Sequence, residues 1–341
     1  MSSESNLGLG VVGAGYWGKN IVRNFTRVKG ASLLYVADLS ESNRERARGL
    51  APNATVTADY DALLRDDAVD AIAVCTPAST HYEIALAALQ AGKHVFVEKP
   101  LTLEGAHADD LVDLAADKGL TLMVGHLMIH HPAIHWIKDQ ITSGEIGELH
   151  YLYCQRVNLG VVRSDESAWW SLAPHDLSIV LYLLDQSPTT ISARGAAYLR
   201  PEIEDVVFAN LKFAGGQMAE VHTSWLDPHK ARLLTLVGSR RMVTFDDTAP
   251  REKVRVYDKG AERTVDYQSY AELITLRQGD IWIPSIPGTE PLLLECQHFV
   301  DCVRDGVEPA TPGSQGRDVV RILQAGQESM ENDGVPISLE R

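Results

Sequence analysis

The chain has 341 residues, a length that indicates two domains or one large domain, and its 45% apolar content is typical of a globular protein with a sizeable core. Asp and Glu (46) outnumber Lys and Arg (31), giving a net charge of −15 without any basic run. Such a chain repels phosphate, so we expect no nucleic-acid or anionic-membrane partner. It has no apolar stretch of membrane-spanning length, no signal-peptide pattern and no CxxC motif among its four cysteines, so we expect a reduced, cytoplasmic protein.

The first part of the chain alternates buried strands with helices. We predict strands at Leu7–Val12, Ser32–Ala37, Val56, Ala71–Cys75, Val95–Val97 and Leu120–Val124. Helices are predicted at Tyr16–Lys29, Glu41–Leu50, Tyr60–Leu64, His81–Ala91 and Glu104–Lys118. This alternation predicts an α/β fold over residues 1–125, a Rossmann-type domain with a doubly wound parallel sheet.

The pattern changes after Gly125. Following a helix at Pro132–Thr142, we predict strands at Leu149–Val157, Thr190–Ala197, Val206–Phe213, Met218–Trp225, Leu233–Val237, Met242–Asp246 and Val254–Tyr257. One helix, Pro174–Leu184, interrupts them, and two helices, Glu290–Asp305 and Ser314–Asp333, follow. Strands without crossover helices predict an α+β domain over residues 126–341 with a large, mostly antiparallel open sheet. An uncovered sheet face favours a homodimer or homotetramer formed through it.

A glycine-rich segment matching G-x-G-x-x-G follows the first predicted strand and opens the first helix. In this context the glycines allow a tight turn and let backbone N–H groups approach a pyrophosphate at a helix N-terminus. The alternative is a glycine-rich turn in a domain that binds no dinucleotide. We predict that cofactor binding involves Gly13, Ala14, Gly15, Tyr16, Trp17 and Gly18.

Asp38 ends the second predicted strand, twenty residues after Gly18. An acid here accepts hydrogen bonds from the adenosine ribose and repels a 2′-phosphate, so we expect NAD rather than NADP. Arg44 and Arg46 lie near enough along the chain to soften this preference. The alternative is that Asp38 caps the helix beginning near Ser40.

Two further segments follow buried strands, at the sheet edge where ligands of open α/β proteins bind. The first contains Thr76, Pro77 and His81, and the second contains Glu98 and Lys99. We expect all five residues to line the cofactor site, with Lys99 near the nicotinamide. The alternative for Lys99 is an ordinary solvated surface charge.

With these motifs the chain resembles the Gfo/Idh/MocA family, which includes glucose–fructose oxidoreductase and inositol dehydrogenase-like proteins. The resemblance covers essentially the whole chain, on the segments GAGYWG, CTPASTH, HVFVEKPL and MVGH. It implies an NAD-dependent dehydrogenase acting on CH–OH groups, in which Lys99 contacts the substrate hydroxyl and the nicotinamide. The segment Ala173-Pro-His-Asp176 is similar to the family's active-site helix, which implies that His175 works with Lys99 in proton transfer.

The segments around His126, Ser143–Gly147, Arg156–Gly160, Arg163–Asp165 and LAPHDLSI resemble a subgroup of nucleotide-sugar dehydrogenases. The resemblance implies oxidation at C3 of UDP-N-acetylglucosamine or its uronic acid. The substrate-binding residues we expect are His126, Asn158, Arg163, Ser171, Lys230 and Arg232. For the last two, ordinary strand-edge cations are the alternative.

Ser171 departs from the family pattern, which often has an acid four residues before the active-site histidine. A serine can hydrogen-bond a sugar but is no ionised base at neutral pH. We therefore expect Lys99 and His175 to be the catalytic residues, without an Asp–His dyad.

The histidines at 126, 130, 131 and 135 have spacings found in metal sites, but Pro132 interrupts any helix that would align them. We therefore expect no metal. Trp169 and Trp170 suit either sugar stacking or, as we favour, burial. Two other functions stay open: an inositol or free-sugar dehydrogenase, and a non-catalytic dinucleotide-binding sensor or scaffold.

Overall fold

The structure is a computed structural model that describes residues 6–160, 162–164, 166–263 and 274–339. It divides into two compact units, each built from two stretches of chain. The first unit contains Met1–His131 and Thr289–Arg321, and the second contains Pro132–Gly288 and Ile322–Arg341.

The first unit contains a parallel sheet of six strands in the order β3-β2-β1-β4-β5-β6. The strands are β1 (Leu7–Val12), β2 (Ala31–Ala37), β3 (Thr55–Thr57), β4 (Ala71–Val74), β5 (His94–Glu98) and β6 (Leu122–Gly125). The chain moves outward from β1 to β3 and then, in the other direction, from β4 to β6. Ligands of such sheets bind beyond the carboxyl ends of the strands where the direction switches, here β1 and β4. The Rossmann prediction is confirmed.

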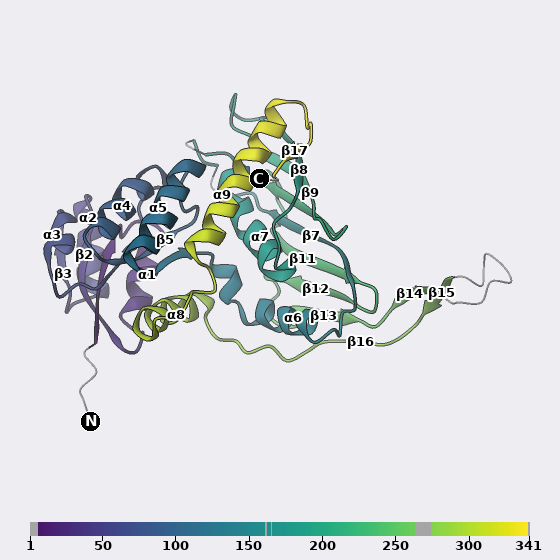
Figure 1. Cartoon of the computed structure of the whole chain (residues 1–341), viewed down its shortest axis with the longest axis horizontal. Helices are drawn as coiled ribbons and strands as arrows, with labels where there is room; N and C mark the ends of the chain where they lie inside the picture. The colour runs from purple at the N-terminus through teal and green to yellow at the C-terminus, as the bar shows by residue number, and fades with distance from the viewer. Residues whose placement is uncertain (1–5, 161, 165, 264–273, 340–341) are drawn as a thin grey trace. The chain divides into compact units, whose positions relative to one another are not determined.

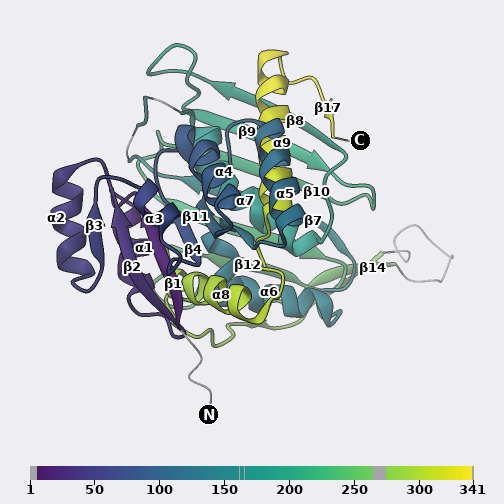
Figure 2. The ribbon, with the colours of Figure 1, turned by 60° about the vertical axis from the view of Figure 1, so that its left-hand side comes forward.

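The helices of this sheet form two groups. They are α1 (Gly18–Phe25), α2 (Glu41–Leu50), α3 (Asp61–Arg65), α4 (His81–Gln90) and α5 (Gly105–Lys118), with 3₁₀ turns η1 (Ala78–Thr80) and η2 (Leu127–His130). α1 packs against α2, while α4 and α5 run side by side (Figures 1 and 2). Right-handed crossovers place the two groups on opposite faces of the sheet. The helix expected from Tyr16 begins at Gly18, because the preceding residues form the turn after β1.

Helix α8 (Pro291–Asp305) completes the core of the first unit. The Phe299 ring lies edge-on to those of Phe25 and Phe96, with ring centroids 6.3 and 5.8 Å apart. Beyond α8, the Thr311 hydroxyl donates a hydrogen bond of 2.7 Å to the carbonyl of Val124 on β6. The domain boundary predicted after residue 125 assigns α8 and the residues around Thr311 to the second domain, whereas they belong to the first unit. The sequence gives no sign of this, because the apolar residues that α8 covers, such as Phe25 and Phe96, are far from it along the chain.

The second unit contains a sheet of nine strands in the order β16-β13-β12-β11-β7-β10-β9-β8-β17. Neighbours in it are antiparallel except β7 and β10, so the mostly antiparallel sheet is confirmed. A two-stranded ribbon pairs β14 (Gly260–Arg263) with β15 (Ile274–Arg277). The nine strands are β7 (Leu149–Val157), β8 (Thr190–Ala196), β9 (Val206–Lys212), β10 (Met218–Ser224), β11 (Ala231–Gly238), β12 (Met242–Asp246), β13 (Val254–Tyr257), β16 (Ile281–Trp282) and β17 (Ile337–Ser338).

Helix α7 (Ala168–Leu184) lies across one face of this sheet and contacts β7, β9 and β10 (Figure 1). It begins six residues before the predicted start at Pro174, which lies inside the helix. Proline removes one helical hydrogen bond, but the buried apolar residues on both sides of it favour an uninterrupted helix. The Trp169 side chain is fully buried, and its indole N–H donates 2.9 Å to the carbonyl of Leu323 on α9 (Gly313–Glu331), as the burial interpretation predicted.

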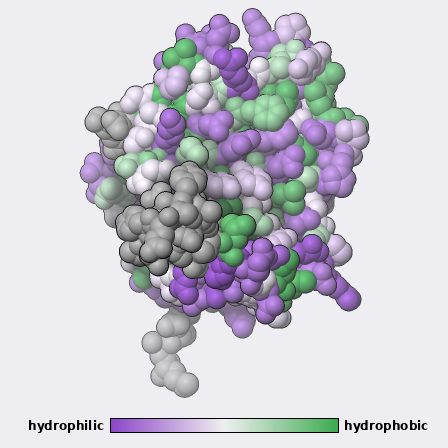
Figure 3. Space-filling model, turned by 90° about the vertical axis from the view of Figure 1, so that its right-hand side faces the viewer, coloured by the Kyte–Doolittle hydropathy of each residue, from purple (hydrophilic) through white to green (hydrophobic). Residues whose placement is uncertain are grey.

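The opposite face of the sheet carries exposed apolar side chains that alternate with buried ones. They are Tyr151, Tyr153, Phe208, Met218 and Leu233, which we call the outer-face residues. Figure 3 looks toward this side of the second unit and shows apolar atoms interspersed with polar ones around the grey residues.

Within the described residues, no helix has the length and apolar character needed to cross a membrane. All four cysteines are free thiols.

Candidate cofactor and substrate site

The glycine-rich loop after β1 has the geometry of a phosphate-binding turn. Gly13 has a φ of +95°, and a Cβ on it would lie 2.6 Å from the carbonyl oxygen of Cys75. A Cβ on Gly18 would lie 2.1 Å from the carbonyl oxygen of Gly13, so both positions require glycine. A Cβ on Gly15 would have its nearest neighbour, the Asn43 amide nitrogen, 3.9 Å away. The backbone there is therefore open to a ligand at the N-terminus of α1. These residues fit a dinucleotide pyrophosphate.

The Asp38 carboxylate ties this loop to the end of β2. Its Oδ2 accepts the Ala14 N–H at 2.7 Å, and its Oδ1 accepts the Ser40 N–H at 2.8 Å. The Asn43 amide donates to both oxygens at 3.2 Å. Asp38 thus holds Ser40, the residue that precedes α2, and also the loop that a ribose and pyrophosphate would approach. The N-cap of α2 is Ser40 rather than Asp38, so Asp38 does not cap the helix as the alternative supposed.

The two arginines beyond Asp38 are engaged locally. Arg44 donates to the carbonyls of Asp38 and Leu39 at 2.7 and 2.9 Å, and it forms an ion pair with Glu41. Arg46 donates to the side chain of Asn43 at 3.2 Å. To bind the 2′-phosphate of NADP, either guanidinium group would have to give up these contacts.

His81 connects the two segments that follow β4 and β5. Its ring is buried, with Nδ1 2.8 Å from the Pro100 carbonyl and Nε2 2.9 Å from the Thr76 carbonyl. The structure therefore gives the imidazole a positioning role between these loops, beside the cis peptide that joins Lys99 to Pro100. Pro77, also predicted to line the site, is exposed at the start of η1.

Glu98, at the end of β5, joins the glycine-rich loop to the lysine. Its Oε1 accepts the indole N–H of Trp17, and its Oε2 accepts the Lys99 N–H at 3.2 Å. Burial raises the pKa of the Glu98 carboxyl to about 7, against the opposing effects of Trp17 and Lys99. Tyr16, the neighbour of Trp17 in the loop, is 82% exposed.

His126 follows β6 and is fully buried. Neither of its ring nitrogens has a hydrogen-bond partner within the part of the chain that the structure describes. Burial, with the positive charge of Lys99, lowers the pKa of His126 to about 3, so the imidazole is neutral. The neutral imidazole can donate a hydrogen bond from one ring nitrogen and accept one at the other.

Pro132 begins α6 (Pro132–Thr142), so the four clustered histidines belong to separate elements. Among the described residues, no three His, Cys, Asp or Glu side chains are grouped as metal ligands.

In the second unit, two of the predicted substrate residues lie at one edge of the sheet. Val157 on β7 is in register with Ser224 of β10 on one side and with Ala231 of β11 on the other. Asn158, which follows β7, and Lys230, which precedes β11, therefore leave the sheet at the same edge. Both are exposed.

Two of the three predicted substrate cations are paired with acids. Arg163 lies 2.8 Å from Glu166, and Arg232 lies 3.1 Å from Asp247. Lys230 has no ion pair within the described part of the chain. The positive charge available to an anionic substrate is therefore smaller than the sequence suggests.

Ser171 and His175 lie one turn apart on α7, so they share a face of the helix. Ser171 is buried, and His175 is half-buried. Asp176 is turned to Arg156 on β7, with two hydrogen bonds of 2.8 Å, so its carboxylate is engaged away from the histidine. Lys99 belongs to the first unit and His175 to the second.

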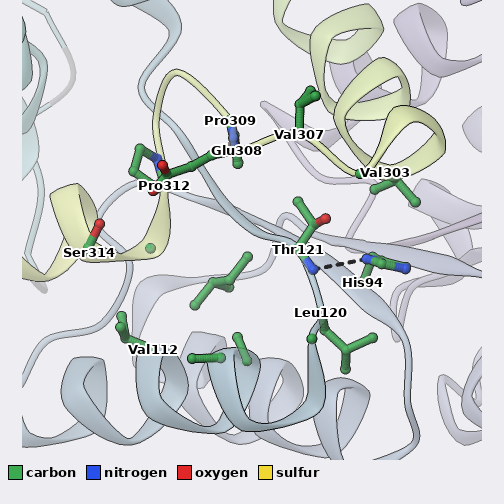
Figure 4. A pocket seen from close by; sticks show the side chains of 16 residues that line it. His94, Val112, Leu120, Thr121, Val303, Val307, Glu308, Pro309, Pro312 and Ser314 are labelled. Atoms are coloured by element: carbon green, nitrogen blue, oxygen red, sulfur yellow. Dashed lines mark hydrogen bonds between the residues drawn. The ribbon is translucent and has the colours of Figure 1, made fainter.

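A pocket of about 400 Å³ lies elsewhere in the first unit, where β5 and β6 begin. Figure 4 shows its lining, including the hydrogen bond of 2.9 Å from the Thr121 N–H to His94 Nδ1. Because open α/β sheets bind ligands beyond the carboxyl ends of their strands, this pocket is at the wrong edge for the cofactor.

One buried acid, Glu295 on α8, was not among the residues predicted from the sequence. The signal was present, because Glu295 interrupts the apolar stripe formed by Leu292, Cys296 and Phe299 on this helix.

The strand order, the open glycine-rich loop and the Asp38 anchor define a dinucleotide-binding enzyme domain. Two domains of one family match the chain: an NAD-binding Rossmann-fold domain of an oxidoreductase family at residues 7–126, and the GFO/IDH/MocA C-terminal domain at residues 134–244. The chain belongs to the Gfo/Idh/MocA family and is an NAD-binding oxidoreductase.

Its relatives include dehydrogenases for different substrates. The UDP-N-acetylglucosamine 3-dehydrogenase of Acidithiobacillus ferrooxidans is 29% identical over 324 residues, covering 91% of this chain and 93% of that protein. The scyllo-inositol 2-dehydrogenase (NAD(+)) of Bacillus subtilis is 28% identical over 348 residues, covering 98% and 95%. A solved structure of the A. ferrooxidans enzyme has a TM-score of 0.81 and 25% identity, covering 96% of this chain and 98% of that one.

Proposed function

We propose that the protein oxidises a secondary hydroxyl of a nucleotide sugar of the UDP-N-acetylglucosamine type, at C3, with NAD as hydride acceptor. The main support is the similarity to the A. ferrooxidans dehydrogenase, which extends through both units rather than the cofactor domain alone. The exposed sheet edge with Asn158 and Lys230 favours a polar, anionic substrate.

In this proposal the glycine-rich loop binds the pyrophosphate of NAD, and Asp38 accepts hydrogen bonds from its adenosine ribose. NAD, when bound, supplies the hydride acceptor. Lys99 donates a hydrogen bond to the substrate hydroxyl and orients it. His175 accepts the hydroxyl proton, and Ser171 hydrogen-bonds the sugar.

A second substrate class is favoured by the ion pairs of Arg163 and Arg232. Because Glu166 and Asp247 offset these two cations, the second unit offers less charge to a diphosphate than the sequence indicates. An uncharged polyol or free sugar does not need positively charged residues for binding, and one relative is a scyllo-inositol 2-dehydrogenase.

A substrate screen separates the two classes. UDP-sugars, sugar phosphates, free sugars and inositols are each incubated with the protein and NAD, and NADH formation is followed. We expect the highest kcat/KM with UDP-N-acetylglucosamine or its uronic acid. A polyol as the best substrate would contradict the proposal, and turnover of none of the four classes would contradict the dehydrogenase mechanism.

We also propose that the protein forms a homodimer or homotetramer through the outer-face residues. Exposed apolar patches on a sheet favour protein–protein contact. On this face the rings of Phe208 on β9 and His222 on β10 stack, with their centroids 4.2 Å apart. Analytical ultracentrifugation of wild-type protein and Tyr153→Glu tests this. We expect a smaller species for the variant, and a wild-type monomer would contradict the assignment.

A further inference from the structure

One buried carboxylate of the second unit, that of Asp205, accepts hydrogen bonds from two separate segments. Asp205 directly precedes β9 and is only 1% exposed. Its Oδ1 accepts the indole N–H of Trp225, which follows β10, and its Oδ2 accepts the N–H groups of Tyr198 and Leu199 at 2.7 and 2.8 Å. Its main-chain carbonyl also accepts the Trp225 N–H at 3.2 Å. Although burial opposes ionisation, the side-chain hydrogen bonds lower the pKa of the Asp205 carboxyl, so it is charged at neutral pH.

Asp205 lies at the sheet edge where the predicted substrate residue Asn158 leaves β7. Val206, the residue after Asp205, is in register with Ser224 at the end of β10. Ser224 is in turn in register with Val157, the residue before Asn158. The carboxylate and the predicted substrate residue are therefore separated by one strand along the same edge.

The turn after β10 connects Asp205 to the segment after β7. The carbonyl of Ser224 accepts the Asn158 N–H at 3.1 Å, and the carbonyl of Asp227 accepts the N–H of the next residue. Trp225 lies between these two carbonyls in sequence. Because Asp205 anchors Trp225, it fixes this turn and, through it, the backbone of Asn158.

The loop between β8 and β9, residues 198–204, contacts two further segments. Arg200 donates a hydrogen bond of 2.9 Å to the carbonyl of Arg163, another predicted substrate residue. The carbonyl of Glu204 accepts the N–H of Ala168, the first residue of α7, at 2.8 Å. The loop that the carboxylate holds is therefore bound to the start of the helix with the predicted active-site histidine.

We propose that Asp205 is a positioning residue for the substrate, whose carboxylate holds Asn158, Arg163 and the start of α7 in the arrangement that binds the sugar. Its oxygens accept three donors of the chain itself, so Asp205 acts through these segments and not by contact with the sugar. The inference rests on the proposed function for the identity of the substrate.

Asp205→Asn keeps the size of the side chain but replaces one acceptor oxygen with a donor NH₂ group. This group then faces either the Trp225 indole or the two backbone N–H groups, so one segment loses its acceptor. In Asp205→Asn/Trp225→Phe the NH₂ group faces a ring without an N–H, and the remaining oxygen accepts from the backbone. The control is Asp258→Asn, because Asp258 is in the same unit but pairs with Arg241 and Arg277.

Amide hydrogen exchange, followed by mass spectrometry, tests the arrangement without substrate or cofactor. In Asp205→Asn we expect peptides over residues 198–204 and 225–228 to exchange about tenfold faster than in the wild type, because these segments open more often. The first unit should keep its wild-type rates, and the double variant should recover slower exchange over residues 198–204. Wild-type exchange over both segments in Asp205→Asn would overturn the proposal.

Calorimetric titration of UDP-N-acetylglucosamine into NADH-saturated protein tests the effect on the substrate without turnover. We expect Asp205→Asn to bind the sugar about tenfold more weakly than the wild type, and Trp225→Phe and the double variant about threefold more weakly. Asp258→Asn should match the wild type, and the Kd for NADH should be the same in all five proteins. A role in stability alone would lower the free energy of unfolding of Asp205→Asn without changing its Kd for the sugar, and that result would overturn the proposal.

Two further outcomes have distinct meanings. If Asp205→Asn does not fold, Trp225→Phe replaces it in both measurements, and equal sugar affinity in Trp225→Phe and the wild type would then overturn the proposal. If the wild type does not bind UDP-N-acetylglucosamine, the substrate assignment is wrong. The titration is then made with the substrate that the screen identifies, and hydrogen exchange still tests the role of Asp205.

Discussion

Arg156 on β7 and Asp176 on α7 form a bidentate ion pair, in which Nε and Nη2 each lie 2.8 Å from a carboxylate oxygen. Their side chains are only 8% and 4% exposed. The pair fixes the helix that carries His175 to the centre of the sheet. It also explains why Asp176, although next to the histidine in sequence, is not its partner.

Removing one member of this pair leaves a buried, uncompensated charge. We expect Arg156→Met and Asp176→Leu each to lower the free energy of unfolding by about 3–5 kcal/mol, measured by urea denaturation. The double variant Arg156→Met/Asp176→Leu should recover most of the loss, because both charges are removed together. If the double variant lost as much as the sum of the two single ones, the coupling would be refuted.

Asp38 is expected to set the preference for NAD. Asp38→Ser should narrow the ratio of NAD to NADP affinity, because a carboxylate no longer repels the 2′-phosphate. It should also weaken NAD binding, since the Ala14 N–H loses its acceptor. Asp38→Asn retains an acceptor and separates the two effects, and the exposed Asp59→Ser is the control. Tighter binding of NADP than NAD by the wild type would contradict this prediction.

Lys99 is expected to act on the substrate rather than on cofactor affinity. Lys99→Met should lower kcat by about a hundredfold or more while leaving the Kd for NAD nearly unchanged. Steady-state kinetics and NAD titration of the same preparation measure both. Lys118→Met, on the surface of the same unit, is the control. Nearly unchanged turnover in Lys99→Met would show that the lysine is a structural cation.

The parts of the site that the sequence predicts are those formed by neighbours along the chain. The turn from Gly13 to Gly18 and the position of Asp38 after β2 follow from short patterns with one structural solution. Contacts between distant segments carry no such pattern. The ring of His81 between Thr76 and Pro100 is one example, and the packing of α8 against Phe25 and Phe96 is another.

The same limit explains the differences at the element ends. The sequence predicts a helix start at Pro174, yet tertiary burial of the residues before it outweighs the hydrogen bond that the proline removes. Likewise, the apolar stripe of α8 is visible in the sequence, but the sequence does not say which sheet it covers.

His126 is expected to make the fold sensitive to acid. Its pKa in the folded protein is about 3, below the ordinary histidine value of 6.5, so only the unfolded chain takes up the proton between these values. Stability is therefore present above pH 6.5 and lost as the pH falls toward 3. In urea denaturation at pH 4–6, the wild type should lose about 1.4 kcal/mol more per pH unit than His126→Gln. The exposed His150→Gln is the control, and equal slopes for the wild type and His126→Gln would refute the assignment.

Ser171 and His175 give the sharpest test of the acid–base mechanism, because they share a face of α7 and Asp176 is held by Arg156. Without a carboxylate at position 171, the pH–rate profile for substrate oxidation should rise in the ordinary range of imidazole, about pH 6–7. Ser171→Asp should move this rise to higher pH, because a nearby anion favours imidazolium. Ser171→Asn matches the aspartate in size without its charge and should leave the rise in place. His175→Asn should remove the rise and lower the rate. If the rise persisted in His175→Asn, another group would be the titrating base, and Lys99 would be the residue to test next.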